Sequence, residues 1–292
     1  MNQTLILAVN SITLGGLLFL LSSGFSLIFG LMRIPNLTHG SLFMLGAYVG
    51  ATLAGASPFF HISIPFWLAA LAAAVAVAAF GGVVERFLLR KLAGAQLAQV
   101  LVTLGIAFMI ADFCLMVWTG DPITVHTPER LTGVARFGAL VFPIYRLVII
   151  IIACIVAAVL WILLERTRLG AMIRAADDDP QMARVVGIRV SQLFTIVFCL
   201  GAALAGFAGF IGAPILSVYP GLDFDMLPLA LVVVILGGTG SLLGSFVGSF
   251  LISFVYNYGQ AYFPELAYFV LFLPMVIMML LRPQGLFGRV AP

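Results

Sequence analysis

Charge is scarce in this sequence. Only 9% of its 292 residues are Asp, Glu, Lys or Arg, whereas 63% are hydrophobic. Soluble domains carry roughly 25% charged residues, so a soluble fold is excluded. The mean hydropathy of +1.21 predicts an all-α polytopic membrane protein surrounded by a lipid bilayer. The net charge of +3 gives no indication of nucleic-acid binding, and we expect none.

The residues of common catalytic and cofactor motifs are also missing. Lys91 is the only lysine, and no glycine-rich loop precedes it, so the chain has no P-loop for ATP. Cys114, Cys154 and Cys199 are scattered through apolar runs, which argues against a disulfide framework or a metal site. We therefore expect no catalysis, no metal and no bound cofactor in this chain.

Apolar runs then predict the membrane spans of one domain over residues 1–292. The first run is expected to be retained, because it lacks the basic start and cleavage site of a signal peptide, and to be interrupted at Gly15-Gly16 and Ser22–Gly24. A run of about 15 residues is shorter than the ~20 that a span needs, and a run of about 32 is too long and is split by glycines. The count is eight or nine crossings, some of them short or broken. The runs are 5–30, 41–55 (short), 65–84, 97–118, 146–164, 192–213, 227–258 (split at 237–241) and 261–281, with a short acidic loop, YPGLDFDM, before the split run.

One polar interval, residues 165–190, stands out from the apolar runs. It holds four of the eleven acids and five of the fourteen bases. Asp178 or Asp179 can cap a helix that starts at Pro180, and Gly187 can end it. Two turns are unstable in water on their own, so this helix needs a docking surface; the alternative is a solvated loop on lipid headgroups. Its apolar residues are Met182, Ala183, Val185 and Val186.

The bases also predict the orientation. Eleven of the fourteen lie on one side if Arg33, the loop at 85–96, the interval 165–190 and the C-terminal segment with Arg282 and Arg289 share that side. By the positive-inside rule that side is cytoplasmic.

Two short segments, HGSLFMLGAYVGA and TGSLLGSFVGS, resemble each other and suggest two pseudo-repeated halves. Paired broken segments are typical of a transport pathway, but their GxxxG spacing is equally typical of helix packing. Asp112 reads as the one acid at membrane depth, which is functional by default unless it reaches the outer headgroups. His39 either lines a pathway or caps the helix that follows. The candidate pathway residues are Asn36, His39, Gly46, Asp112, Gly237, Gly238 and Gly240.

Four stretches resemble the permeases of branched-chain amino acid ABC transporters of the LivH type. They are SSGFSLIFGLMRIPNLTHGSLFMLGAYVG, GAMIRAADDDPQMARVVGIRV, DFDMLPLALVVVILGGTGSLLGSFVGS and RPQGLFG. They occur in the family's order and cover essentially the whole chain. The chain departs from the family pattern at Asp177–Asp179 and at Pro35, which weakens claims about contacts at those positions.

The resemblance implies a permease of the bacterial inner membrane. It implies as partners a second, LivM-like permease, two cytoplasmic ATPases that hold ATP and Mg²⁺, and a periplasmic binding protein for leucine, isoleucine or valine. The interval 165–190 would then be the coupling segment that docks on an ATPase, through Arg174, Asp178, Asp179, Pro180, Met182, Ala183, Val186 and Gly187. Permeases for urea, short amides or other amino acids, a stand-alone carrier or channel, and a non-transporting scaffold remain as alternatives.

Overall fold

The computed structural model describes residues 2–32, 36–57, 62–137, 140–282 and 284–288. Arg33, Pro35 and Arg289 lie outside the described residues. The elements in chain order are α1 (Asn2–Met32), α2 (Thr38–Leu53), α3 (Phe66–Phe87), η1 (Leu89–Leu92), α4 (Gln96–Trp118), η2 (Glu129–Leu131), β1 (Val134–Phe137), β2 (Leu140–Pro143), α5 (Ile144–Arg166), α6 (Arg168–Asp178), α7 (Pro180–Val185), α8 (Val190–Leu216), α9 (Leu222–Gly237), α10 (Leu242–Tyr262), η3 (Pro264–Leu266) and α11 (Ala267–Leu281).

Helices dominate the fold, and six of those described are long and apolar enough to cross a membrane: α1, α3, α4, α5, α8 and α10. The multi-pass, all-α prediction is therefore confirmed. The short run became α2 and the split run became α9 and α10, with the break at the glycine turn 238–241. At 16 residues each, α2 and α9 are about 24 Å long, less than the ~30 Å hydrocarbon core.

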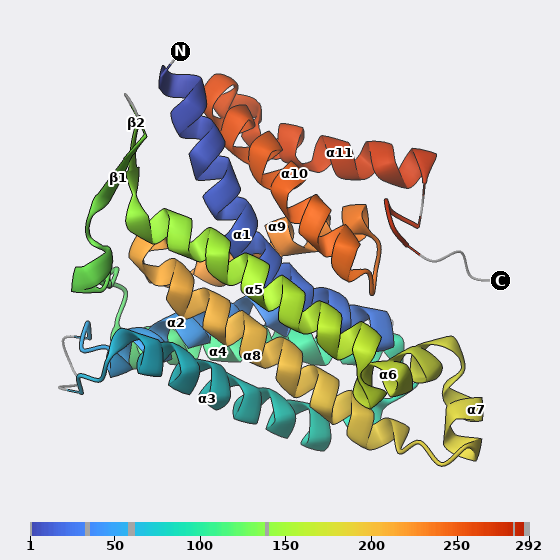
Figure 1. Ribbon diagram of the computed structural model, residues 1–292. Coiled ribbons are helices and arrows are strands. Elements are labelled where there is room, and N and C mark those ends of the chain that lie inside the picture. Colours follow the sequence, from blue (N-terminus) through green and yellow to red (C-terminus); the bar gives the residue numbers. More distant parts are fainter. Residues whose placement is uncertain (1, 33–35, 58–61, 138–139, 283, 289–292) are drawn as a thin grey trace.

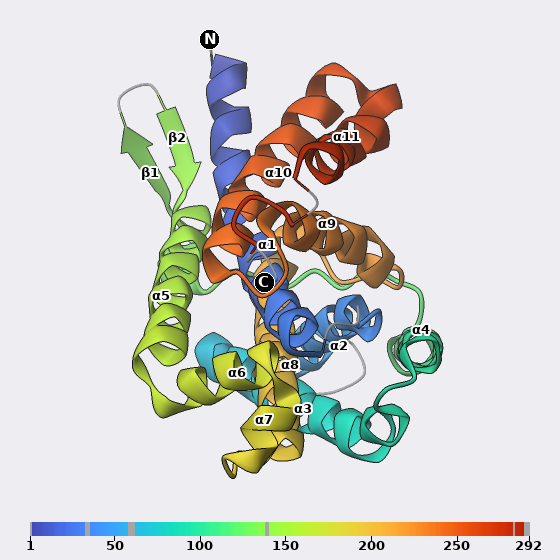
Figure 2. The same cartoon turned by 90° about the vertical axis from the view of Figure 1, so that its right-hand side faces the viewer.

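The centre of the bundle is formed by α1 and α8 (Figures 1 and 2). α8 packs on α1, α2 and α3, while α1 also packs on α5, α9 and α10. Small residues allow these close approaches: a Cβ on Gly46 of α2 would overlap the backbone of Gly206 in α8. α4 lies at the edge of the bundle, mainly against α2 and η1 (Figure 2).

The first span is not interrupted, contrary to the expectation from its glycines and serines. α1 runs unbroken for 31 residues. Its glycines are packing sites, since a Cβ on Gly24 would meet the backbone of Gly201 in α8 at 2.6 Å. The Ser22 and Ser23 hydroxyls donate to the carbonyls of Leu18 and Leu20 within the same helix, so neither residue breaks it.

The long segment between α4 and α5, which separates the apolar runs 97–118 and 146–164, contains an antiparallel hairpin. β1 pairs with β2, with Val134 opposite Pro143. Before it, Ile123 exchanges backbone hydrogen bonds with Val218 at the end of α8. This region lies at the end of the bundle opposite α6 and α7 (Figure 1).

Candidate functional site

Two helices form the charged interval, and sequence reasoning anticipated only the second. α6 begins after Thr167, whose hydroxyl caps the helix by accepting from the Gly170 amide at 3.3 Å. The Arg174 guanidinium donates to the carbonyl of Leu164 and forms an ion pair with Glu165 at 3.5 Å. Arg174 therefore holds α6 against the end of α5, the span that precedes it.

α7 has the start and end that its sequence predicts. Asp179 is the N-cap, and its carboxylate accepts from the amides of Gln181 and Met182 at 2.8 and 3.0 Å. Pro180 is the first helical residue, and Gly187 follows the helix with φ +90°, a conformation that suits glycine. Of the two proposed caps, Asp179 performs the role, whereas Asp178 ends α6.

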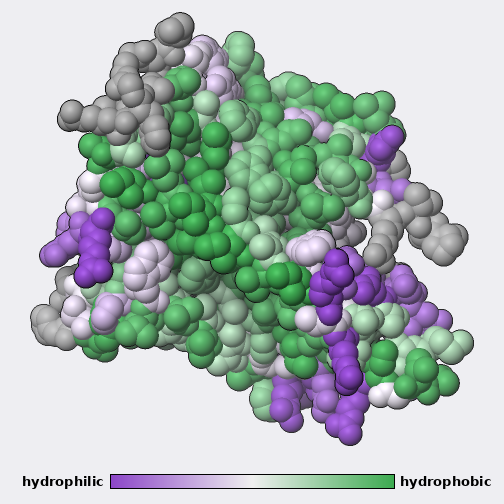
Figure 3. Space-filling model, in the orientation of Figure 1, coloured by the Kyte–Doolittle hydropathy of each residue, from purple (hydrophilic) through white to green (hydrophobic). Residues whose placement is uncertain are grey.

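The two faces of α7 differ sharply. Ala183 is only 2% exposed and belongs to a small hydrophobic cluster with residues of α1, α5, α6 and α8; α7 itself packs on α6 and α8. Met182, Val185 and Val186 are 60%, 81% and 75% exposed. We call these three residues the α7 patch. Hydrophilic residues gather at the end of the molecule that carries α6 and α7 (Figures 1 and 3). Ala183 thus anchors α7 to the bundle, and the α7 patch remains accessible for contact with another molecule.

A second group of polar residues is buried where α2 begins. The Asn36 side chain accepts from the Thr38 amide at 3.2 Å, and the Asn36 carbonyl accepts from the His39 amide at 3.1 Å. His39 lies inside α2 and does not cap it: its Nε2 is 3.0 Å from the carbonyl of Leu21 in α1. Asn36 Nδ2 and His39 Nδ1 are buried without a hydrogen-bond partner. Polar atoms of this kind are costly at membrane depth unless a ligand or water reaches them.

Two acids that the sequence did not single out are buried inside the fold. Asp223, expected in a loop, lies in the first turn of α9, is buried, and accepts a hydrogen bond from Ser41 at 2.8 Å. Glu85, near the end of α3, is also buried. Asp112 is exposed on the outer face of α4. A functional role of Asp112 at membrane depth stays a prediction. The hydrogen bond from Ser41, 182 residues away, places Asp223 inside the fold.

The candidate glycines all lie in close packing. Gly237 and Gly244 approach each other backbone to backbone, as Gly46 and Gly206 do. Gly238 and Gly240 have φ of +97° and +76° in the turn before α10, and the Gly240 amide donates to Ser26 of α1 at 3.1 Å. Helix packing accounts for these glycines, and a role in a pathway stays a prediction.

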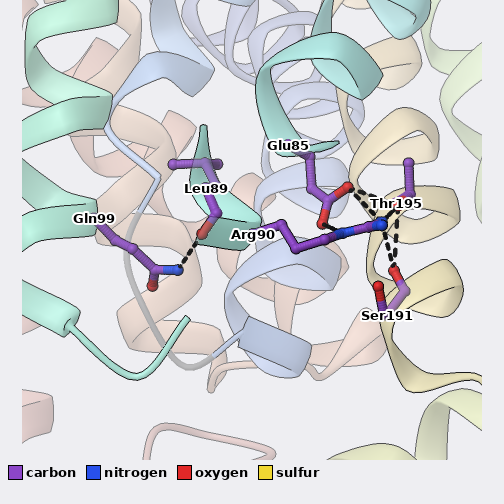
Figure 4. A network of polar contacts seen from close by, with 6 residues as sticks. All are labelled: Glu85, Leu89, Arg90, Gln99, Ser191 and Thr195. Carbon is purple, nitrogen blue, oxygen red and sulfur yellow. Dashed lines mark hydrogen bonds and ion pairs between the residues drawn. The ribbon is translucent and has the colours of Figure 1, made fainter. Parts of the chain in front are cut away.

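A polar network joins α3, η1 and α8 beside α7 (Figure 4). The Arg90 guanidinium reaches Glu85 at 3.3 Å, the carbonyl of Ser191 at 3.0 Å, and the Thr195 hydroxyl. The Thr195 hydroxyl donates to Glu85 at 2.6 Å. Close by, the Gln99 amide donates to the carbonyl of Leu89 at 3.0 Å. Among the described residues, no group of three His, Cys, Asp or Glu side chains could hold a metal ion.

Six apolar helices, a charged helical segment at one end and buried polar atoms between helices define a multi-pass membrane protein with the features of a transporter subunit. The chain matches the family described as "branched-chain amino acid transport system / permease component" over residues 7–279. The chain belongs to this family and is a transport subunit.

Curated relatives span nearly the whole chain. The high-affinity branched-chain amino acid transport system permease protein BraD of Pseudomonas aeruginosa is 28% identical over 96% of this chain and 94% of the relative. LivH of Escherichia coli, with the same description, is 26% identical over the same shares. The ribose import permease protein RbsC of Escherichia coli is 28% identical over 73% of this chain and 65% of the relative. No solved structure matches the chain.

Proposed function

We propose that this chain is the membrane-spanning permease subunit of an ATP-driven importer for leucine, isoleucine or valine. The relatives that match the full length carry branched-chain amino acid names, whereas the ribose permease matches a shorter part. ATP and Mg²⁺ bind to two partner ATPases in the cytoplasm of a bacterial cell. A binding protein delivers the substrate on the opposite, periplasmic side of the inner membrane, where the hairpin lies.

The α7 patch is the observation that carries the proposal. Three exposed aliphatic or thioether side chains on a two-turn helix favour a protein partner, because removing apolar surface from water lowers the free energy. The same helix packs on α6 and on the start of α8, and α6 is held to the end of α5 through Arg174. An ATPase that moves α7 therefore acts through these contacts on α5 and α8, the spans on either side of the segment, which is what alternating access requires.

A second permease subunit lies against the outer face of α4. Asp112 is exposed there beside Phe108, Met109 and Met116, and a carboxylate facing hydrocarbon costs about 2.5–3.5 kcal/mol. The exposed face of α5, with Ile151, Ile155 and Val159, carries no such charge and suits lipid. A partner helix with a hydrogen-bond donor removes the cost at Asp112.

Asn36 and His39 are the pathway candidates with unpartnered buried atoms, and Asp223 joins them as a buried carboxylate with one free oxygen. A zwitterionic amino acid needs a hydrogen-bond acceptor for its ammonium group and a donor for its carboxylate group. These residues supply both an acceptor and a donor. Gly46, Gly237, Gly238 and Gly240 set the spacing of the helices around them.

Substitution of Val185 tests the proposal. In proteoliposomes that contain the permeases, ATPases and binding protein, Val185→Glu places a charge in the α7 patch. It should lower leucine-stimulated ATPase activity and leucine uptake about tenfold, equivalent to ~1.4 kcal/mol of coupling. Membrane insertion should be unchanged, because Val185 is exposed. Gln181→Glu is the matched control, since it adds the same charge to an exposed polar position of the same helix.

Full coupling in Val185→Glu would contradict the docking role of α7. Labelled leucine, urea and ribose are offered in parallel to identify the substrate. Uptake by the chain without ATPases would instead favour a stand-alone carrier or channel.

A further inference from the structure

A cavity of ≈ 190 Å³ lies beside α7, where η1, α4 and the start of α8 meet. An engineered protein cavity of about 150 Å³ holds benzene, so this one suits a ligand of amino-acid size. Its apolar wall includes Met32, Leu89 and Phe194. Asn36, His39 and Asp223, the proposed pathway residues with unpartnered buried atoms, are not among the residues that line the cavity.

Gln99 lines this cavity and has an unused hydrogen-bond acceptor. Its side chain is 5% exposed, and its Nε2 is fixed by the Leu89 carbonyl at 3.0 Å. Its Oε1 is buried without a hydrogen-bond partner. A buried acceptor without a partner is unfavourable, and a ligand N–H group would satisfy it.

Arg184 of α7 presents a cation to the same cavity. Among the described residues it forms no ion pair, whereas Arg90, the other arginine of the lining, is held by Glu85, Ser191 and Thr195 (Figure 4). A free guanidinium binds carboxylate or phosphate groups in a two-pronged geometry. The cavity therefore combines a free acceptor, a free cation and an apolar wall.

We propose that this cavity binds a small zwitterion with an aliphatic chain. The ammonium group donates to Gln99 Oε1, the anionic group binds Arg184, and the chain lies against Met32, Leu89 and Phe194. Two sources have this chemistry: a free aliphatic amino acid, and the headgroup of phosphatidylethanolamine. Because Arg184 belongs to α7, a bound zwitterion ties α7 to α4 and restrains its movement.

The regulatory consequence rests on the proposed function. If α7 couples ATP hydrolysis to transport, a ligand at this cavity lowers the coupling from the side on which imported substrate is released. Occupancy itself does not depend on transport, so binding and transport are measured separately.

Binding is measured on the purified full-length chain in nanodiscs of phosphatidylcholine, which lacks a primary ammonium group. L-leucine is titrated in one arm, and phosphatidylethanolamine is added to the bilayer in the other, with protection of a cysteine placed at Ala93 as a common readout. Ala93 lines the cavity and is exposed. Gln99→Leu should weaken protection about tenfold, the effect of leaving a donor unpaired. Gln96→Leu, an exposed glutamine in the first turn of the same helix, should leave it unchanged.

Protection by leucine that Gln99→Leu weakens supports the site with an amino acid as ligand, and protection by phosphatidylethanolamine alone supports it with a lipid. A second variant, Ala93→Phe, should fill the cavity and remove binding by isothermal titration, even if Gln99→Leu folds poorly. Absence of protection by either compound, or equal effects of Gln96→Leu and Gln99→Leu, overturns the proposal. Failure of transport with binding intact would count only against the proposed function.

Discussion

α2 and α7 are both short helices, but their structures have different origins. α7 is defined by its own sequence: Asp179 caps it, Pro180 opens it and Gly187 follows it. α2 depends on distant parts of the chain. Its first turn is tied to α4 through the Thr38 hydroxyl and the Thr103 carbonyl at 2.9 Å, and to α9 through Ser41 and Asp223.

The difference matches what each helix faces. Most residues of α2 are buried among other helices, so packing decides its position. α7 is buried at Ala183 and exposed elsewhere, so it can change position at the cost of few contacts. The two helices therefore differ in how firmly the rest of the fold holds them: α2 is buried along most of its length, and α7 mainly at Ala183.

The largest effect is expected from a bulky residue at Gly46, where α2 closely approaches α8. Gly46→Leu places a side chain into the backbone of Gly206, and overpacking of this severity exceeds the usual ~1–3 kcal/mol. We expect little folded protein, measured as the yield of monodisperse material and its thermal unfolding temperature. Gly105→Leu in α4 is the control, because a Cβ there meets nothing within 4 Å. Equal yields of the two variants would contradict the packing role of Gly46.

A smaller effect is expected from the hydrogen bond between Ser41 and Asp223. A double-mutant cycle with Ser41→Ala and Asp223→Asn should give a coupling of about 1.5–3 kcal/mol, the range for hydrogen bonds to charged groups. The quantity measured is the free energy of unfolding in detergent. Additive single-mutant effects would show that α2 is held without this contact.

The same contrast explains how much of the molecule was predictable from its sequence. Signals that act within a few residues could be read directly: the cap at Asp179, the glycine after α7, and the break at 238–241 between α9 and α10. Long apolar runs gave the spans for the same reason, since hydrophobicity is a local property.

Features that depend on contacts between distant residues could not be read. The glycines of α1 suggested interruptions, but α1 is one continuous helix and these glycines lie at its close contacts with α8 and other helices. Asp223 looked like a loop acid because Ser41 is far away in sequence. α6 is an exception: Leu169, Met172, Ile173 and Ala176 have helical spacing behind the cap Thr167, so a search for amphipathic periodicity would have found it.

The smallest effect is expected at the N-cap of α7, where a change should affect α7 and leave α2 unaffected. Asp179→Ala removes the acceptor for the amides of Gln181 and Met182, and loss of such a cap costs about 1 kcal/mol. Because α7 is exposed on most sides, we expect local fraying with no change in the global unfolding temperature. Hydrogen exchange should therefore become faster in the peptide that covers α7 and remain unchanged in the peptide that covers α2. Asp178→Ala is the control, since Asp178 ends α6 and caps nothing in α7. A fall in the global unfolding temperature of Asp179→Ala would mean that α7 is part of the cooperative core, which would contradict the loose attachment inferred from its exposure.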